Sequence, residues 1–366
     1  MKQVVLDQPG RLAVRDVAEP VPGPGDVVIA VQAALTCGTD LKTFRRGHPK
    51  FPCPTPFGHE ASGVIVASGR EVTAFATGDA LMTANSGPCG SCFWCRSDEE
   101  NLCETLTDEL LLGAYAEYLL VPARILRRNA FVKPDALSFE VAALLEPLSS
   151  VCFGITKIPS RKIRGGATVL LIGSGPIAML WLRALQTYGA ERVLVAGRRS
   201  ARLEIARSMG ALATIAEDDS AGLDAVVAEY TGGRGCDAVI ECTGQTEVWE
   251  TAPRHARRGG SVVLFGGCTA GSRASFDTGR LHYDGVEITS PFHFRPRDVA
   301  EARRLLERPE LDWSPLISGR ISLEQVPAAF AHLGDHGEMK LAVVPGLGPG
   351  PGPVVAGTVA GRGAAR

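Results

Sequence analysis

The sequence predicts an α/β protein of two domains, an irregular β domain and a doubly wound parallel sheet. The chain has 366 residues, 45% of them hydrophobic and 21% charged, which is enough for two separate cores. Residues 1 to about 150 are rich in Gly and Pro and hold short β-type runs. From about Gly165 strand and helix patterns alternate, as in parallel βαβ units.

The first region predicts strands at residues 26–35, 61–69 and 114–122. After Pro291 the remaining pieces are too small to stand alone, and we expect them to return to the first domain. They are predicted to be helices at 297–307 and 323–333 and a strand at 340–345.

The middle region alternates between short apolar runs and amphipathic segments. The predicted strands are 167–173, 192–197, 237–244 and 260–267. The predicted helices are 176–189, 201–210 and 246–258. We therefore expect one domain over residues 151–291 and the other over 1–150 and 292–345. Residues 346–366 form a Gly/Pro/Ala tail that we expect to be disordered.

Composition excludes several classes of function. The formal net charge is −2 and no dense block of Lys and Arg occurs, so we expect no nucleic-acid partner. The N-terminal residues lack a basic segment followed by an apolar run, and no stretch approaches the roughly 20 apolar residues of a membrane span. A cytoplasmic protein with a small-molecule substrate is expected.

Four cysteines stand close together in GPCGSCFWCRSDEENLC. A tetrahedral zinc ion held by four thiolates needs such short spacers, so that side chains of one loop converge about 2.3 Å from the metal. The alternatives are a disulfide pair or unrelated thiols. The spacing predicts a closed structural zinc site, whose ligands are Cys89, Cys92, Cys95 and Cys103.

A glycine-rich turn in ATVLLIGSGPIAML separates a predicted strand from a predicted helix. Gly173 permits the tight turn, Gly175 lets the backbone approach a pyrophosphate, and Ala178 lets the helix sit close to the sheet. The positive helix N-terminus, with Pro176 and Ile177, would lie under the phosphates. The pattern predicts a dinucleotide site rather than a merely tight turn.

The end of the next strand predicts the preferred dinucleotide. NAD sites usually place Asp or Glu there to bind the adenosine ribose, but this chain has Gly197. Arg198, Arg199 and Ser200 follow and offer positive charge and a hydroxyl donor to a 2′-phosphate. NADP is therefore favoured over NAD. The alternative is that both arginines are solvated and the site accepts either cofactor.

A second set of possible metal ligands is scattered along the chain: Cys37 in TCGTD, His59 and Glu60 in GHE, and Glu146 in EPLSS. Cys, His and a carboxylate suit a catalytic zinc, which keeps one position open for water or substrate. Each residue alone is weak evidence, but together with the cysteine lobe and the dinucleotide turn they indicate an open zinc site.

The motifs TCGTD, GHE, the cysteine lobe and GSGPIA, in this order, resemble the zinc-dependent medium-chain dehydrogenase/reductase family over residues 1 to about 345. The resemblance implies a GroES-like catalytic domain and a Rossmann domain. It implies one catalytic and one structural zinc, with Cys37 and His59 as ligands. Glu60 is the expected third ligand, and Glu146 is an alternate ligand or a neighbour of the ligand set. Asp40 would orient His59 by accepting its ring N–H.

The resemblance implies hydride transfer between a secondary alcohol and NAD(P), with Thr39 as proton relay. Glu60 and Glu146 favour the sorbitol (polyol) branch, whereas TCGTD also resembles threonine dehydrogenases, so a polyol, a cyclitol and an amino alcohol all remain candidates. The segments that usually shape the substrate pocket in this family, residues 44–54 and 290–296, match no specific subfamily, so the substrate stays open. A homodimer or homotetramer is expected by analogy. The alternatives are a catalytically silent member and a zinc-free quinone-reductase-like member, but the latter would not need the cysteine lobe.

Overall fold

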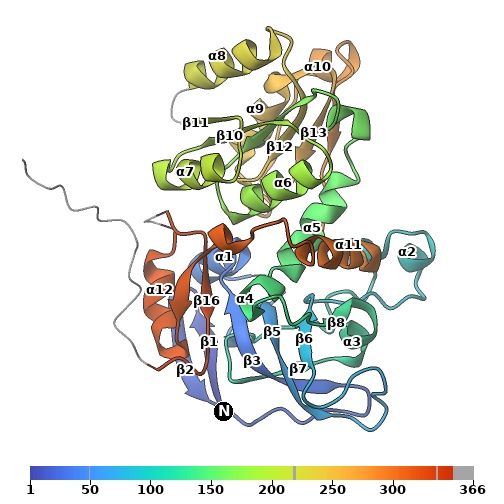
Figure 1. Cartoon of the computed structure of the whole chain (residues 1–366), viewed down its shortest axis with the longest axis vertical. Helices are drawn as coiled ribbons and strands as arrows, with labels where there is room; N and C mark the ends of the chain where they lie inside the picture. Colours follow the sequence, from blue (N-terminus) through green and yellow to red (C-terminus); the bar gives the residue numbers. More distant parts are fainter. Residues whose placement is uncertain (49, 217–219, 335–336, 349–366) are drawn as a thin grey trace, which may run out of the picture.

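The computed structural model describes residues 1–48, 50–216, 220–334 and 337–348. It contains one body around a parallel sheet and another around mostly antiparallel sheets, stacked along the long axis of the molecule (Figure 1). The expected α/β fold class is confirmed. From residue 349 on, the expected disordered tail lies outside the described residues.

The parallel sheet has six strands within the described chain, in the order β11-β10-β9-β12-β13-β14. Successive side chains of β9 enter different cores: Val169 and Leu171 face the cluster of α6, while Leu170 and Ile172 face the cluster of α8. Helices therefore cover both faces, as a doubly wound sheet requires. The strands are β9 (Thr168–Ile172), β10 (Arg192–Gly197), β11 (Ala213–Ala216), β12 (Cys236–Glu241), β13 (Ala256–Leu264) and β14 (Glu287–Thr289).

The helices of this body differ from expectation in that α8 and α10 were not predicted and one predicted helix is shorter. The helix predicted over 246–258 ends at Thr251, because Pro253 has no N–H to continue the ladder, and β13 already begins at Ala256. The helices are α6 (Pro176–Thr187), α7 (Ser200–Ser208), α8 (Ser220–Thr231), α9 (Thr246–Thr251), α10 (Thr278–His282) and the short 3-10 turns η2 (Ser160–Lys162) and η3 (Ala252–His255).

The other body is built on a larger sheet in the order β15-β16-β3-β5-β6-β8, with β7 also paired to β3. The C-terminal strand β16 pairs with β3 through Ala342 and Leu35, so both ends of the chain contribute to this sheet. Its strands are β3 (Val27–Leu35), β5 (Glu60–Ser68), β6 (Ala80–Thr83), β7 (Tyr118–Val121), β8 (Ala130–Val132), β15 (Ile317–Ile321) and β16 (Lys340–Val343).

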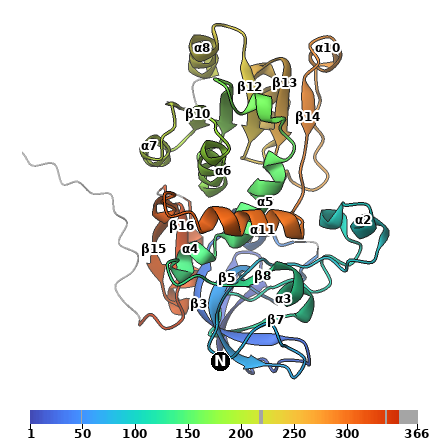
Figure 2. The same ribbon diagram turned by 45° about the vertical axis from the view of Figure 1, so that its right-hand side comes forward.

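A three-stranded sheet and short helices complete this body. The sheet holds β1 (Lys2–Gln8), β2 (Arg11–Asp16) and β4 (Thr55–Pro56). The helices are α1 (Gly38–Arg46), α2 (Phe93–Arg96), α3 (Ala123–Asn129), α4 (Phe139–Ala142), α12 (Val326–His332) and the 3-10 turns η1 (Glu100–Leu102), η4 (Ser314–Leu316) and η5 (Leu323–Gln325). The loop around α2 projects from the side of the molecule (Figure 2).

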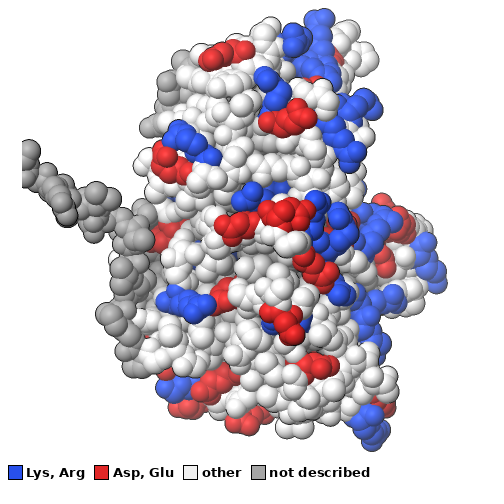
Figure 3. Space-filling model, in the orientation of Figure 1, with Lys and Arg blue, Asp and Glu red and all other residues white. Residues whose placement is uncertain are grey.

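Two helices join the bodies. Helix α5 (Leu145–Ile155) is buried along nearly its whole length and packs in one core with α6 and α11 (Pro296–Leu306). The boundary expected at residue 150 therefore falls inside a buried helix and not in a linker. Acidic and basic side chains intermix over the visible face and gather where α11 approaches the α2 loop (Figure 3). Among the described helices, none is both long and apolar enough to cross a membrane.

Candidate active site and metal centres

Three possible metal ligands converge where α1 and β5 begin. Cys37 caps α1 and its Sγ accepts a hydrogen bond from the Thr39 N–H at 3.4 Å. His59 and Glu60 stand at the start of β5, and Glu60 pairs across the sheet with Leu35, two residues before Cys37. The Cys37 thiol, the His59 ring and the Glu60 carboxylate therefore lie within 4.8 Å of one another. One thiol, one imidazole and one carboxylate form a donor set that suits zinc.

His59 is held by a hydrogen-bonded pair behind it. Its Nδ1 lies 2.9 Å from Asp40 Oδ1, and the Tyr115 hydroxyl donates to Asp40 Oδ2 at 2.6 Å. Gly58, at φ 89°, lets the chain pass the Tyr115 ring, since a Cβ there would lie 2.7 Å from the ring. Burial disfavours a charged His59, but the Asp40 carboxylate outweighs it and raises the pKa of His59 well above its ordinary value. The same negative field favours a divalent cation.

Glu60 is already paired inside the protein. Its two oxygens lie 2.8 and 2.6 Å from Lys340 Nζ, which also donates to the Thr36 carbonyl at 3.0 Å. Glu60 is fully buried and Lys340 is 1% exposed. Burial works against the ammonium, but the Glu60 carboxylate outweighs it and raises the pKa of Lys340. The carboxylate is therefore neutralised by a lysine that the strand pattern of residues 340–345 did not single out.

Glu146 is buried in the first turn of α5. Burial raises its pKa to about 7, opposed by the charge of His59, and the charges of Glu60 and Asp40 add to the increase. Within the described part of the chain no hydrogen bond or ion pair involves its carboxylate. Its oxygens are not among the enclosed side-chain atoms that lack a partner, and it lies outside the group in which Cys37, His59 and Glu60 come within 4.8 Å of one another.

The four-cysteine lobe is a separate cluster. All four sulfurs lie within 4.8 Å of one another, with 3.8 Å between Cys89 and Cys95 and 3.5 Å between Cys92 and Cys95. A tetrahedron with bonds of 2.3 Å has edges of about 3.8 Å, so the spacing fits a zinc ion. Hydrogen bonds from the Ser91 N–H and hydroxyl and the Cys92 N–H lower the pKa of Cys89 to about 5, which favours the thiolate.

The dinucleotide turn lies between β9 and the N-terminus of α6. Gly173 has φ 114°, and a Cβ there would lie 3.2 Å from Thr243 and 3.3 Å from Cys242. Gly175 is the N-cap of α6, and Pro176 opens the helix, followed by Ile177 and the buried Ala178. The N-terminal N–H groups of a twelve-residue helix thus face the turn, as pyrophosphate binding requires.

The end of β10 is shaped by this turn. A Cβ at Gly197 would lie 2.3 Å from the Ser174 hydroxyl and 2.4 Å from its Cβ, so the serine excludes any larger residue. Arg198, Arg199 and Ser200 are exposed at the start of α7. Neither arginine makes an ion pair with a described residue.

Comparison with known proteins agrees with this geometry. The family model of the alcohol dehydrogenase GroES-like domain matches residues 23–130, and that of zinc-binding dehydrogenases matches residues 176–308. The sorbitol dehydrogenase of Bacillus subtilis is 30% identical over 272 residues, 73% of this chain and 75% of that protein. The chain belongs to the zinc-dependent medium-chain dehydrogenase family. It is an NAD(P)-dependent alcohol dehydrogenase, and nothing favours the silent alternative.

Other members of this dehydrogenase family are similar over most of their length. The L-threonine 3-dehydrogenase of Serratia proteamaculans is 28% identical over 320 residues, 86% of this chain and 91% of that protein. A structure from Sinorhizobium meliloti, solved with NADP, is 30% identical and has a TM-score of 0.84, covering 94% of this chain and 99% of its own. The relatives therefore differ in named substrate while sharing the fold.

Three residues of the dehydrogenase site escaped sequence reasoning. Lys340 neutralises Glu60, Tyr115 supports Asp40, and Arg202 of α7 donates to the carbonyls of Gly337 and Glu338 beside β16. Burial lowers the pKa of Arg202 to about 10, and the charge of Arg199 adds to this. For Lys340 the available sequence signal was its position, since a lysine begins the otherwise apolar strand KLAVV.

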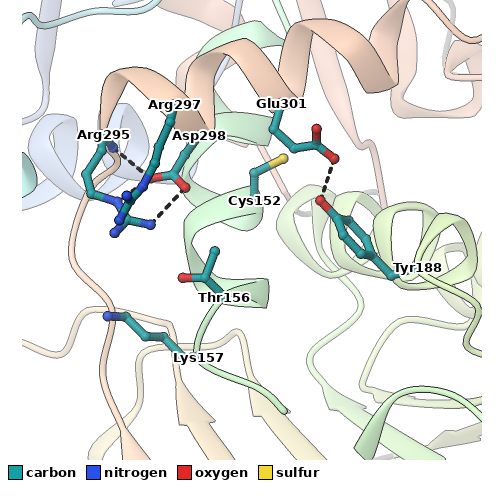
Figure 4. A pocket seen from close by; sticks show the side chains of 8 residues that line it. All are labelled: Cys152, Thr156, Lys157, Tyr188, Arg295, Arg297, Asp298 and Glu301. Atoms are coloured by element: carbon teal, nitrogen blue, oxygen red, sulfur yellow. Dashed lines mark hydrogen bonds and ion pairs between the residues drawn. The ribbon is translucent and has the colours of Figure 1, made fainter. Parts of the chain in front are cut away.

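A cavity of about 450 Å³ lies away from the metal ligands, between the end of α5 and the start of α11 (Figure 4). Arg295 lies along one wall and is paired with Asp298, while Tyr188 and Glu301 form a hydrogen bond on the other. Arg297 and Lys157 also line the cavity, and the ion-pair partner of Arg297, Asp98, lies outside it.

Proposed function

We propose that Cys37 and His59 hold a catalytic zinc together with a carboxylate, and that Glu146 supplies it. The observation that carries this assignment is the ion pair of Glu60, both of whose oxygens are bound to Lys340. Glu146 is buried, is influenced by the charges of His59 and Glu60, and has no hydrogen-bond or ion-pair partner among the described residues. Glu60 is close enough to reach a metal but would have to leave its lysine. Its role is then to balance charge next to the ligand His59.

A zinc ion bound at this position would supply Lewis acidity for the reaction of the alcohol. The chain's own residues do the rest. Asp40 accepts from His59 and keeps the imidazole turned toward the site. The exposed Thr39 hydroxyl, on the first turn of α1, is placed to carry the alcohol proton outward. The reaction is the interconversion of a secondary alcohol and a ketone.

The cofactor is held by the turn from Gly173 to Ala178, and we propose that NADP is preferred to NAD. Gly197 leaves no carboxylate to repel a 2′-phosphate, and Ser174 fills the space a carboxylate would need. Arg198 and Arg199 are exposed beside it, with Ser200 as a hydroxyl donor. The NADP in the Sinorhizobium meliloti structure supports this preference.

The four-cysteine lobe would hold a second, structural zinc, since four thiolates leave no position for a substrate. The proposed domains are 1–150 with 292–345 and 151–291, and β16 supports this division by pairing with β3. A homodimer or homotetramer is proposed by family analogy. The substrate would be a polyol, a cyclitol or an amino alcohol.

The test combines metal analysis with nicotinamide absorbance over a panel of these alcohols. We expect about two zinc ions per chain and reduction of NADP with at least one substrate. Glu146→Gln should lose one zinc and activity, whereas the matched Glu60→Gln should keep both ions. If instead Glu60→Gln loses the ion and Glu146→Gln keeps it, the ligand assignment is wrong. No reduction with any alcohol in protein holding two zinc ions would refute the proposed reaction.

Cofactor preference has its own test. The double variant Arg198→Ala with Arg199→Ala should lower kcat/KM for NADP by roughly 10–100-fold for each arginine that bonds to the phosphate, since one charged hydrogen bond contributes about 1.5–3 kcal/mol. The value for NAD should change little. An unchanged ratio between the cofactors would show that the arginines do not bind the phosphate.

A further inference from the structure

The cavity between α5 and α11 brings three cationic side chains to one of its sides (Figure 4). Lys157, Arg295 and Arg297 lie there, while Tyr188 and Glu301 lie on the opposite side. Arg295 is buried, whereas Lys157 and Arg297 are exposed to solvent. The volume of about 450 Å³ is within the range of roughly 300–1,000 Å³ that small-molecule sites occupy. The cavity is therefore large enough for a small organic ligand.

Both carboxylates of the lining are already neutralised. Asp298 accepts from Arg295 Nε at 2.8 Å and from its Nη2 at 3.1 Å. Glu301 accepts from Arg304 Nε at 2.8 Å and from its Nη2 at 2.6 Å, and Arg304 does not line the cavity. Neither carboxylate therefore balances the two remaining cations of the lining.

Lys157 forms no ion pair with a described residue. Its Nζ lies 4.5 Å from the centre of the Phe153 ring, and the guanidinium carbon of Arg295 lies 4.6 Å from the same centre. Two cations that share one aromatic ring repel each other. An anion bound to both would offset this repulsion.

Arg297 is held by an exposed ion pair. Its Nη2 lies 2.6 Å from Asp98 Oδ2, and the two side chains are 53% and 65% exposed. Water screens such a pair, so it contributes little to stability. Asp98 also lies 4.0 Å from Arg295 Nη1, the nitrogen of that guanidinium that does not bond to Asp298. An anion in the cavity would therefore compete with Asp98 for both arginines.

The end of α5 opposes an anion only weakly. Free carbonyl groups at a helix C-terminus carry partial negative charge. Here the Phe153 carbonyl accepts from the Thr156 N–H at 3.1 Å and from its hydroxyl at 2.6 Å. The Gly154 carbonyl accepts from the Lys157 N–H at 3.0 Å. Because these carbonyls are bonded, the cationic side chains dominate the field on their side of the cavity.

We propose that this cavity binds a phosphate group, free or as the monoester of a small organic molecule, between Lys157, Arg295 and Arg297. The ammonium supplies a point charge, and the planar guanidinium groups fit phosphate oxygens. A phosphate monoester carries nearly two negative charges at neutral pH, which matches the two cations that the lining leaves unbalanced. No residue of the dinucleotide turn or of the two candidate metal clusters lines this cavity.

The test is a calorimetric titration of the zinc-loaded enzyme with glycerol 3-phosphate, with NADP added to fill the phosphate subsites of the cofactor. We expect one ligand per chain with a Kd of about 1 mM or lower, and no binding of glycerol. Inorganic phosphate is the second probe and identifies the source. If it binds more weakly than glycerol 3-phosphate, the ligand is an ester, and if it binds equally well, the ligand is free phosphate.

Two variants remove a charge from the cavity. Lys157→Met and Arg297→Met keep an apolar stem, and each should weaken binding by about tenfold or more, because each loses a charge-assisted hydrogen bond. Arg303→Met removes a cation of α11 that does not line the cavity, so this matched control should bind as the wild type does. Arg295 is left unchanged, since its loss would leave the buried Asp298 unpaired.

Asp98→Asn tests the competition for the arginines. Asn tolerates the φ of 64° at this position and removes the negative charge. Binding should tighten by about threefold, because Arg297 no longer has a charged partner outside the cavity. Weaker binding in this variant would show that the arginines do not hold the ligand.

Two results would overturn the inference. The first is the absence of saturable binding, or binding that is unchanged in both Lys157→Met and Arg297→Met. The second is binding that is lost in the double variant Arg198→Ala with Arg199→Ala, which would place the phosphate at the cofactor site. The titration needs no turnover, so a failure of the proposed reaction is distinguishable from a failure of this site.

Discussion

The two candidate metal clusters of this dehydrogenase are assembled in opposite ways. The cysteine lobe takes its four candidate ligands from one loop between Cys89 and Cys103, and backbone N–H groups donate to its sulfurs. The candidate catalytic cluster combines Cys37, at the start of α1, with His59 and Glu60, at the start of β5. The first is closed and chemically uniform, while the second is mixed, buried and charged. The spacing of cysteines in one loop is enough to form the first cluster. The second forms only because distant parts of the chain pack against each other.

Removing a ligand from the buried cluster should have the largest effect. Cys37→Ser should abolish binding of one zinc and lower kcat/KM by more than the roughly 100-fold typical of losing an outer partner. Metal analysis and steady-state kinetics check this. Cys53→Ala, a cysteine outside both clusters, is the control and should keep both ions. Full activity in Cys37→Ser would remove the basis for calling this cluster catalytic.

Breaking the pair behind that cluster should chiefly cost stability. Lys340→Met leaves the fully buried Glu60 without a cation and should destabilise the fold by about 3–5 kcal/mol, measured by urea unfolding. Adding Glu60→Gln to this variant should recover much of the loss. If the double variant is as unstable as the sum of the single ones, the pair is not coupled as its geometry indicates.

Removing a cysteine from the four-cysteine lobe should lower kcat less than removing Cys37 does. Cys95→Ser should release the other zinc and lower Tm by on the order of 10 °C. Because Asn101 and Asp98 of the lobe bond to Phe292 and Arg297, KM for the alcohol substrate should rise while kcat stays within about tenfold of the wild type. Ser91→Ala, which leaves all four sulfurs, is the matched control. A fall in kcat as large as in Cys37→Ser would erase the distinction between the clusters.

The smallest effect concerns pH. Burial lowers the pKa of His293 to about 4, below the roughly 6.5 of an unfolded histidine. The folded state therefore binds fewer protons, and the resulting stability is present above pH 6.5 and lost as pH falls through 4. Urea unfolding of wild type and His293→Asn should show a smaller gap at pH 5 than at pH 7.

The sequence predicted the features that depend on a short stretch of the chain. It did not predict those that depend on contacts between distant residues. The cysteine spacing and the turn from Gly173 to Ala178 are local, so their physics is visible in the sequence. The alternation of apolar and amphipathic segments likewise predicted the parallel sheet. The hydrogen bonds of Lys340, Tyr115 and His293 depend on partners 280, 75 and 207 residues away. No periodicity encodes such contacts, because tertiary packing creates them.

Ser174 limits how the proposed cofactor preference could be changed by substitution. The Cβ of an aspartate introduced at Gly197 to favour NAD would lie 2.3 Å from the Ser174 hydroxyl oxygen. This single substitution would therefore distort the dinucleotide turn and would not simply shift the cofactor preference. A route toward NAD must first shrink residue 174 and only then alter residue 197. The Ser174 side chain therefore determines the order in which the two substitutions can accumulate. Engineering of the cofactor preference should change residues 174 and 197 in the same variant.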